Sequence, residues 1–286
     1  MAEFLADLPR YAFLQYALLA GVLASIACGI VGTYVVTRRI TSVAGAIAHS
    51  ILGGMGAARY CQVVLGWSWF DPLIGAVLSA IAAAVVIAMV RITARQREDT
   101  VIASVWAIGM AIGLLFIFRT PGYNEDLMSY LFGSILMVTP DDLRLMGGLD
   151  VLVAVVALLF YNKFLAVCFD EEFARIRGVR VEAYHILLLC LTALTVVLLV
   201  TVVGIVMVIA LLTLPAAAAS HFSRKLWHMM VLSTLFTVLF TTAGMALSYG
   251  PDLPAGATII IIAGAAYILV VFFHQAFYRA IRAERG

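Results

Sequence analysis

A single histidine, His49, stands inside the apolar stretch GAIAHSILGGMGAA at residues 45–58. Neutral imidazole is a common ligand for zinc and for manganese-type ions. An ionisable ring is costly in hydrocarbon unless it faces a polar cavity, so an intramembrane histidine indicates a functional site by default. We therefore predict that His49 is a transient ligand on the path of a metal ion. The alternative is a hydrogen-bonded histidine of the protein interior.

Small residues surround this histidine. Gly45, Gly53 and Gly54 recur on the same stretch and let neighbouring backbones approach closely. A tightly packed bundle without any transport role needs the same residues. The glycines therefore predict close helix packing and leave function open.

Two further positions interrupt apolar runs. Gly204 separates two short runs, and Pro215 lies inside the stretch VGIVMVIALLTLPAAAAS. A proline within a helix removes one backbone hydrogen bond and kinks or ends the helix. We predict a hinge or a cavity-lining break here, and a proline-kinked packing helix is an equally good interpretation.

A polar excursion, DEEFARIRGVRVEAY, occupies residues 170–184. It begins with acids and reaches Gly178 followed by a valine, just before the next apolar run. A short helix of this kind on the membrane surface is able to dock in a groove of a soluble partner. The alternative is a solvated loop whose charges only follow the membrane topology.

The elements that position these residues are apolar helices. Hydrophobic residues make up 64% of the 286-residue chain and charged residues 12%, whereas ordinary soluble domains are about 25% charged. Apolar runs of about 20 residues recur, each long enough to cross a hydrocarbon core as a helix. We predict an all-α, polytopic transmembrane helical bundle with eight or nine spans, forming a single domain over residues 1–286. The candidate spans are residues 12–36, 43–66, 72–90, 100–118, 145–162, 184–203, 204–220, 228–248 and 256–275.

Basic residues predict the orientation. Lys and Arg favour short cytoplasmic loops. With the N-terminus outside, 14 of the 18 basic residues fall on cytoplasmic loops, and the exceptions are Arg10, Arg59, Arg119 and Arg144. The C-terminus is then cytoplasmic. The net charge of +2 comes without a dense basic patch, so we expect no nucleic acid among the partners.

The sequence contains no GxxxxGK[ST] phosphate loop. The polar excursion is also far too short to hold a nucleotide-binding domain. Any ATP chemistry must therefore come from another polypeptide, and we predict a transport subunit rather than an enzyme.

Six strings together resemble the permease subunits of bacterial zinc and manganese ABC importers, the ABC-3 family. They occur in family order and cover nearly the whole chain: GIVGTYVVTRRI, AGAIAHSILGG, NEDLMSYLFGSIL, ARIRGV, VGIVMVIALLTLPAAAAS and LPAGATIIIIAG. The resemblance implies an ABC importer permease fold and a homodimer or pseudo-dimer. It also implies a location in the bacterial cytoplasmic (inner) membrane, where the protein contacts membrane lipid. It also implies alternating access along a path between the two permease copies.

The same resemblance implies two protein partners. A cytoplasmic ATP-binding cassette ATPase is expected to dock on the coupling loop formed by Ala174, Arg175, Gly178 and Val179. An extracytoplasmic metal-binding solute-binding protein is expected to deliver the ion. Zinc or manganese would be the transported substrate, with no cofactor bound stably.

One departure from the family pattern concerns the metal site. Many members have an aspartate four residues before the histidine, one helical turn away, but here that position is Gly45. Either another helix supplies a carboxylate, or the site is transient and weak, which suits conduction. A lone imidazole favours zinc over manganese, because hard oxygen ligands suit manganese better.

Two alternatives belong to other classes. A stand-alone secondary metal-ion carrier would need a coupling site, usually acids inside spans, and the predicted spans hold essentially no Asp or Glu. A structural membrane protein without transport activity is compatible with the composition, and the resemblance argues against it.

Overall fold

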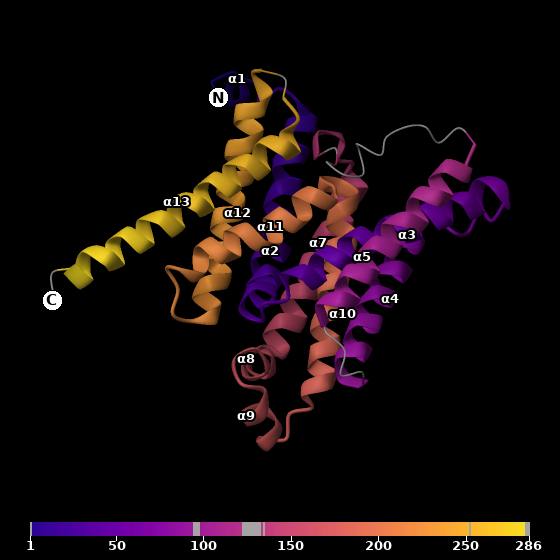
Figure 1. Ribbon diagram of the computed structural model, residues 1–286. Coiled ribbons are helices and arrows are strands. Elements are labelled where there is room, and N and C mark those ends of the chain that lie inside the picture. Colours follow the sequence, from indigo (N-terminus) through magenta and orange to yellow (C-terminus); the bar gives the residue numbers. More distant parts are fainter. Residues whose placement is uncertain (1, 94–97, 122–132, 134, 252, 284–286) are drawn as a thin grey trace. The chain divides into compact units, whose positions relative to one another are not determined.

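A computed structural model describes the backbone of the chain apart from residues 1, 94–97, 122–132, 134, 252 and 284–286. In the described part the regular structure is helical (Figure 1). The helices are α1 (Ala2–Asp7), α2 (Ala12–Thr37), α3 (Thr41–Val64), α4 (Pro72–Thr93), α5 (Glu98–Arg119), η1 (Ile135–Met137), α7 (Pro140–Leu159), α8 (Tyr161–Phe169), α9 (Glu171–Ile176), α10 (Val181–Val203), α11 (Ile205–Ser220), α12 (Leu226–Tyr249) and α13 (Ala255–Ala283).

Six of the described helices, α2, α4, α5, α10, α12 and α13, are long and apolar enough to cross a membrane. The count reaches seven if α7 and α8, which meet at an angle of 70°, form one broken span. Every apolar run named above falls on a helix, but α11 has only 16 residues and α3 is diluted by glycine, serine and histidine. The all-helical membrane fold is therefore confirmed, while eight or nine spans stays a prediction.

The string NEDLMSYLFGSIL falls largely on residues 122–132, outside the described residues. Its end is described, as the short 3-10 helix η1.

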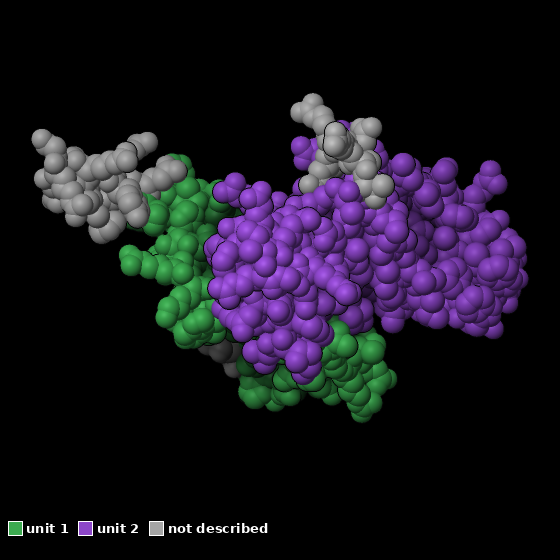
Figure 2. All heavy atoms as spheres, turned by 90° about the horizontal axis from the view of Figure 1, so that it is seen from below, with its two compact units in different colours: residues 1–36, 134–154, 210–286 green, residues 37–133, 155–209 purple. Residues whose placement is uncertain are grey.

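The chain divides into two compact units, coloured separately in Figure 2. Unit 1 comprises residues 1–36, 134–154 and 210–286, and unit 2 comprises residues 37–133 and 155–209. Both units are assembled from segments far apart in the sequence. The expectation of a single domain over residues 1–286 is not tested by this division.

Polar side chains inside the helices mostly bond to their own backbone. Ser25, Thr33 and Thr192 are buried, and each donates its hydroxyl hydrogen to the carbonyl oxygen four residues earlier. In a membrane such local bonds satisfy hydroxyl groups that have no water to bind. These residues therefore need no functional role to explain their burial.

Within unit 2, α3 packs closely against both α4 and α5 through its glycines. A Cβ atom at Gly54 would lie 2.1 Å from the carbonyl oxygen of Gly75 in α4, and one at Gly53 would lie 2.8 Å from that of Gly109 in α5. Backbone atoms cannot swing aside as a flexible side chain can. The helix that carries His49 is thus held between two neighbours by backbone contact.

We expect Gly54→Ala to lower the stability of the chain by about 1–3 kcal/mol, the range typical of overpacking. The added methyl group would force α3 and α4 apart. The thermal midpoint of the purified protein in detergent measures this loss. Gly148→Ala is the matched control, because a Cβ atom there has open space around it. An equal midpoint for both variants would contradict the close packing.

Candidate functional site

His49 lies on α3 of unit 2, with its ring stacked on the indole of Trp106 from α5. The ring centroids are 4.3 Å apart and the planes differ by 15°. The Nδ1 atom is buried and has no hydrogen-bond partner among the described residues. This imidazole therefore has an aromatic neighbour on one face and a ring nitrogen without a partner.

Trp106 also covers the position where the family pattern has an aspartate. A Cβ atom at Gly45 would lie 3.4 Å from the Cζ3 atom of Trp106. A Cβ atom there would be in van der Waals contact with the indole. This side of His49 thus carries an aromatic surface in place of a carboxylate.

The described residues contain no group of three or more His, Cys, Asp or Glu side chains able to hold a metal ion. Within the described part, His49 therefore belongs to no group of three such ligands. Such a donor set fits a passing ion better than a stored one, since multiple protein ligands are the rule at stable sites.

The excursion at residues 170–184 forms the short helix α9 and a turn. Asp170 caps the start, because its side chain accepts a hydrogen bond from the backbone N–H of Phe173 at 2.9 Å. At the other end Gly178 has a φ of +75°. The backbone N–H groups of Gly178 and Val179 donate to the carbonyls of Arg175 and Ala174, respectively, at 2.9 and 3.0 Å. These two bonds form a Schellman motif, which ends α9 sharply.

The two faces of α9 differ. Ala174 is fully buried and packs with Val167, Val179 and Val181. Phe173 and Ile176 are exposed, Ile176 to 85%. One face of α9 is thus buried through Ala174, while the other exposes the apolar side chains of Phe173 and Ile176. This is the segment where the sequence predicts a docking partner.

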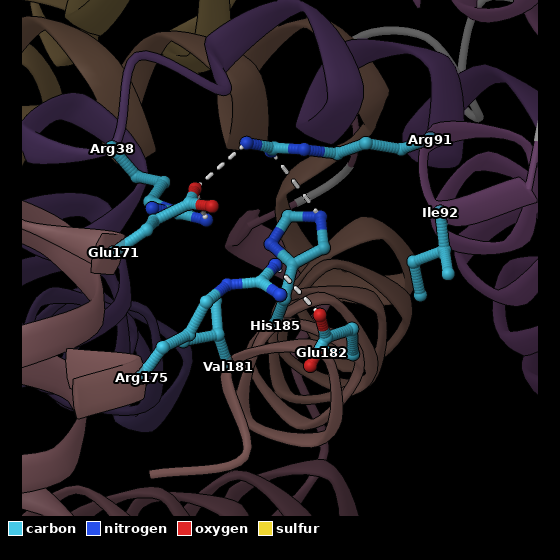
Figure 3. A pocket seen from close by; sticks show the side chains of 8 residues that line it. All are labelled: Arg38, Arg91, Ile92, Glu171, Arg175, Val181, Glu182 and His185. Carbon is cyan, nitrogen blue, oxygen red and sulfur yellow. Dashed lines mark hydrogen bonds and ion pairs between the residues drawn. The ribbon is translucent and has the colours of Figure 1, made fainter. Parts of the chain in front are cut away.

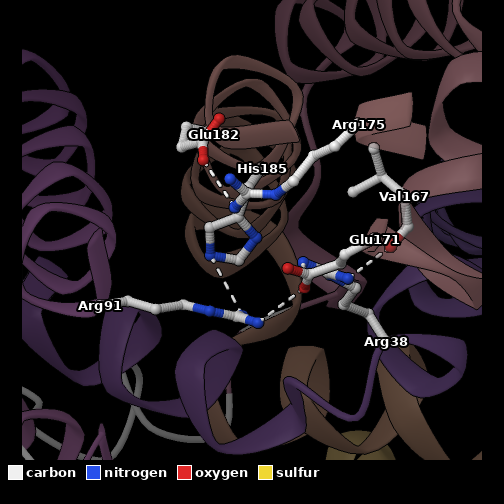
Figure 4. A network of polar contacts seen from close by, with 7 residues as sticks. All are labelled: Arg38, Arg91, Val167, Glu171, Arg175, Glu182 and His185. Atoms are coloured by element: carbon white, nitrogen blue, oxygen red, sulfur yellow. Dashed lines mark hydrogen bonds and ion pairs between the residues drawn. The ribbon is translucent and has the colours of Figure 1, made fainter. Parts of the chain in front are cut away.

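A network of charges joins α9 to the ends of other elements of unit 2 (Figure 4). Glu171 accepts hydrogen bonds from Arg38 at 2.6 Å and from Arg91 at 3.0 Å. Arg38 also donates to the carbonyl oxygen of Val167, and Arg91 lies 3.4 Å from the Nε2 atom of His185. One carboxylate therefore connects the excursion to two cations that follow or end predicted spans.

Partial burial by itself would raise the pKa of Glu171. The positive charges of Arg38 and Arg91, together with the hydrogen bond from Arg38, outweigh that effect and hold the pKa below its ordinary value. A carboxylate whose pKa falls on folding stabilises the folded chain above its unfolded pKa and loses that contribution as the pH falls. The network is thus intact at neutral pH.

Of the breaks predicted in the apolar runs, Gly204 separates α10 from α11 and has a φ of +80°. Pro215 lies inside α11, which continues through it to Ser220. The hinge role of both residues stays a prediction.

Sequence reasoning passed over Asp150, an exception to the spans almost free of acids. It lies within α7 in unit 1, is 7% exposed, and its Oδ2 atom has no partner in the described part of the chain. Trp106 was also missed. An aromatic residue in an apolar run carries no signal of its own, whereas a lone aspartate in such a run does, and it could have been found.

The helices and their apolar lengths define a polytopic membrane protein. The model of the ABC 3 transport family matches residues 10–274, so the chain belongs to that family. The family-level prediction is confirmed.

Similar proteins with known names are also membrane proteins of transport systems. The chain is 42% identical over 249 residues to a probable metal transport system membrane protein of Chlamydia pneumoniae, covering 87% of this chain and 85% of the relative. It is 31% identical over 273 residues to the manganese import system permease protein ScaB of Streptococcus parasanguinis, covering 96% and 94%. The structure of PsaBC from Streptococcus pneumoniae in complex with Fab superimposes with a TM-score of 0.82 at 29% identity, covering 94% of both chains. The chain is thus a membrane protein of the ABC 3 transport family and not an enzyme.

Proposed function

We propose that the chain is the permease of an ATP-driven importer of a divalent transition metal ion. The observation that carries the proposal is His49, a partly buried imidazole on α3 whose helix is fixed by backbone contact. Its Nδ1 atom has no hydrogen-bond partner among the residues that the structure describes. A ring nitrogen left open in this way is able to ligate an ion briefly, and a site with few protein ligands lets the ion leave.

The partners follow from the rest of the chain. The sequence has no phosphate loop, so a separate cytoplasmic ATPase supplies ATP hydrolysis and docks on α9 through Phe173 and Ile176. An extracytoplasmic solute-binding protein delivers the ion, and a second copy of the permease completes the path. The protein lies in the bacterial cytoplasmic membrane with the N-terminus outside, as the distribution of Lys and Arg supports.

Two arguments about the metal point in opposite directions. A lone imidazole favours zinc, whereas relatives such as the Streptococcus parasanguinis permease are named for manganese. We propose a transition metal ion of this pair and make manganese the first to test, because whole-chain similarity reflects more residues than one ligand does.

We expect deletion of the gene to remove uptake of radiolabelled manganese, or of zinc, in metal-depleted cells that lack other importers. A plasmid copy should restore it. Loss of manganese uptake alone assigns manganese, and loss of zinc uptake alone assigns zinc. Retention of both uptakes would contradict a role in metal import.

Asp150 favours a second candidate, a stand-alone secondary carrier, because buried acids in spans serve as ion-coupling groups. Proteoliposomes separate the two. Uptake that requires ATP and a co-purified ATPase supports the importer, while uptake by the permease alone, driven by a proton gradient, supports the carrier.

A further inference from the structure

A cavity of about 300 Å³ lies in unit 2 beside α9 (Figure 3). Its polar lining comes from four segments, namely the residue after α2, the end of α4, helix α9 and the start of α10. The charged or ionisable side chains that line it are Arg38, Arg91, Arg175, Glu171, Glu182 and His185. The segments that meet at this cavity are therefore the same ones that the charge network joins.

The cavity lining is rich in hydrogen-bond donors. Three guanidinium groups face two carboxylates, so these charged side chains carry an excess of positive charge. Glu171 is shared between Arg38 and Arg91, and Glu182 pairs with Arg175 at 2.6 Å. Guanidinium groups only donate hydrogen bonds, and carboxylates only accept them. Any acceptor for the three arginines beyond the two carboxylates therefore has to come from outside these charged side chains.

Two buried donors lack an acceptor. The Nε atom of Arg38 has none in the described part of the protein, although the side chain is only 7% exposed. A guanidinium cannot accept, so the contact from Arg91 makes Nε2 of His185 the acceptor and leaves the proton on Nδ1. That Nδ1 atom is buried and also has no partner among the described residues, in a residue that is 3% exposed. Buried donors left unpaired are unfavourable.

We propose that this cavity binds a phosphate oxyanion, belonging either to a phospholipid headgroup or to free phosphate. Arg38 and His185 both line the cavity, phosphate oxygens are hydrogen-bond acceptors, and guanidinium groups are the usual partners of phosphate. Its volume exceeds that of a phosphate group several times, which leaves room for the rest of a headgroup or for water.

The location suits a headgroup. Arg38 follows the last residue of α2, Arg91 lies in the last turn of α4, and His185 lies near the start of α10. All three helices are candidate spans, so their ends lie at the level where lipid phosphates occur. A bound oxyanion would then tie α9 to the ends of the spans. This inference does not depend on which metal is transported.

The test uses the full-length permease, purified in detergent, with two arms. Inorganic phosphate is titrated while the thermal midpoint is measured, and short-chain phosphatidylglycerol is titrated with retained lipid measured by native mass spectrometry. Diacylglycerol, which lacks the phosphate, is the control ligand. Saturable binding of the phospholipid alone identifies a headgroup, and saturable binding of inorganic phosphate identifies the free ion. Binding of neither overturns the proposal and leaves the cavity to water.

Two variants have opposite expected effects. Arg38→Gln removes a buried cation and should weaken binding by about tenfold or more, since hydrogen bonds to charged groups are the strong ones. Glu171→Gln removes a competing carboxylate and should strengthen binding severalfold. Arg144→Gln, on a solvent-exposed pair, should change nothing. Should Arg38→Gln fail to fold, Arg175→Gln at the rim replaces it, with a smaller loss expected. Unchanged binding in a folded cation variant, or weaker binding in Glu171→Gln, overturns the proposal.

Discussion

His49→Ala should lower metal uptake by about tenfold to a hundredfold or more while leaving the permease in the membrane. A change at a group that only orients a metal ligand already reduces metal affinity or activity by about that much, and loss of the ligand itself removes the coordinating nitrogen. His49→Gln tests the same point with a side chain closer in size, so that the face of Trp106 keeps a neighbour. Uptake of radiolabelled metal by cells with equal permease abundance measures the effect.

His228→Ala is the matched control, because that histidine is exposed and lies at the start of α12. Its uptake should equal that of the wild type. Uptake at the wild-type level in both His49 variants would sink the ligand hypothesis and make the ring an ordinary packing partner of Trp106. Loss of abundance in the alanine variant alone would assign a packing role, and the glutamine variant then decides the chemistry.

The expected loss of uptake in His49→Ala is large because Gly45 lies where an aspartate would be one helical turn before the histidine. Where a carboxylate one helical turn before a histidine shares the ion, removal of the ring leaves part of the site. Here Gly45 provides no ligand, and Trp106 lies over that position. Because Gly45 brings no carboxylate to share the ion, the fractional loss from one substitution should be larger in this chain.

The helices and the packing of α3 could be predicted from the sequence because both depend on local signals. Apolar length marks the spans, and glycine spacing marks the places where backbones meet, as Gly54 and Gly75 do. The span count was harder. It depends on whether α3, with its glycines and histidine, the short α11 and the bent pair α7 and α8 each cross the membrane. Apolar length marks a span clearly only for a long, straight and uniformly apolar helix.

The ends of α9 were also readable, from Asp170 at its start and Gly178 at its end. The charge network was not. Arg38 and Glu171 are 133 positions apart in the chain, and nothing in one sequence pairs two charges over such a distance. The same holds for Trp106 and His49, whose contact arises only when α5 packs on α3. Helix caps depend on neighbouring residues and can be predicted from the sequence, whereas contacts between residues far apart in the chain depend on how the helices pack.

Gly178→Leu should uncouple ATP hydrolysis from transport without disturbing membrane insertion. A φ of +75° is costly for leucine, by about 1–2 kcal/mol, although no atom lies within 4 Å of the added Cβ. The substitution therefore acts through the backbone and not through a clash. Relief of the strain would break the two hydrogen bonds that close α9 and change the direction in which Phe173 and Ile176 point. The metal ions transported per ATP hydrolysed, with co-purification of the ATPase, measure the outcome.

Two further variants separate position from strain. Gly178→Asn should retain much of the coupling, because asparagine tolerates positive φ better than leucine does. Gly66 has a φ of +73° and equally open surroundings, but it lies in the turn after α3, far along the chain from α9. Gly66→Leu should therefore keep the ATPase bound. Equal loss of ATPase binding in both leucine variants would mean that backbone strain at either glycine disrupts the fold. Loss of ATPase binding in Gly178→Leu alone would show that the ATPase depends on the backbone geometry that ends α9.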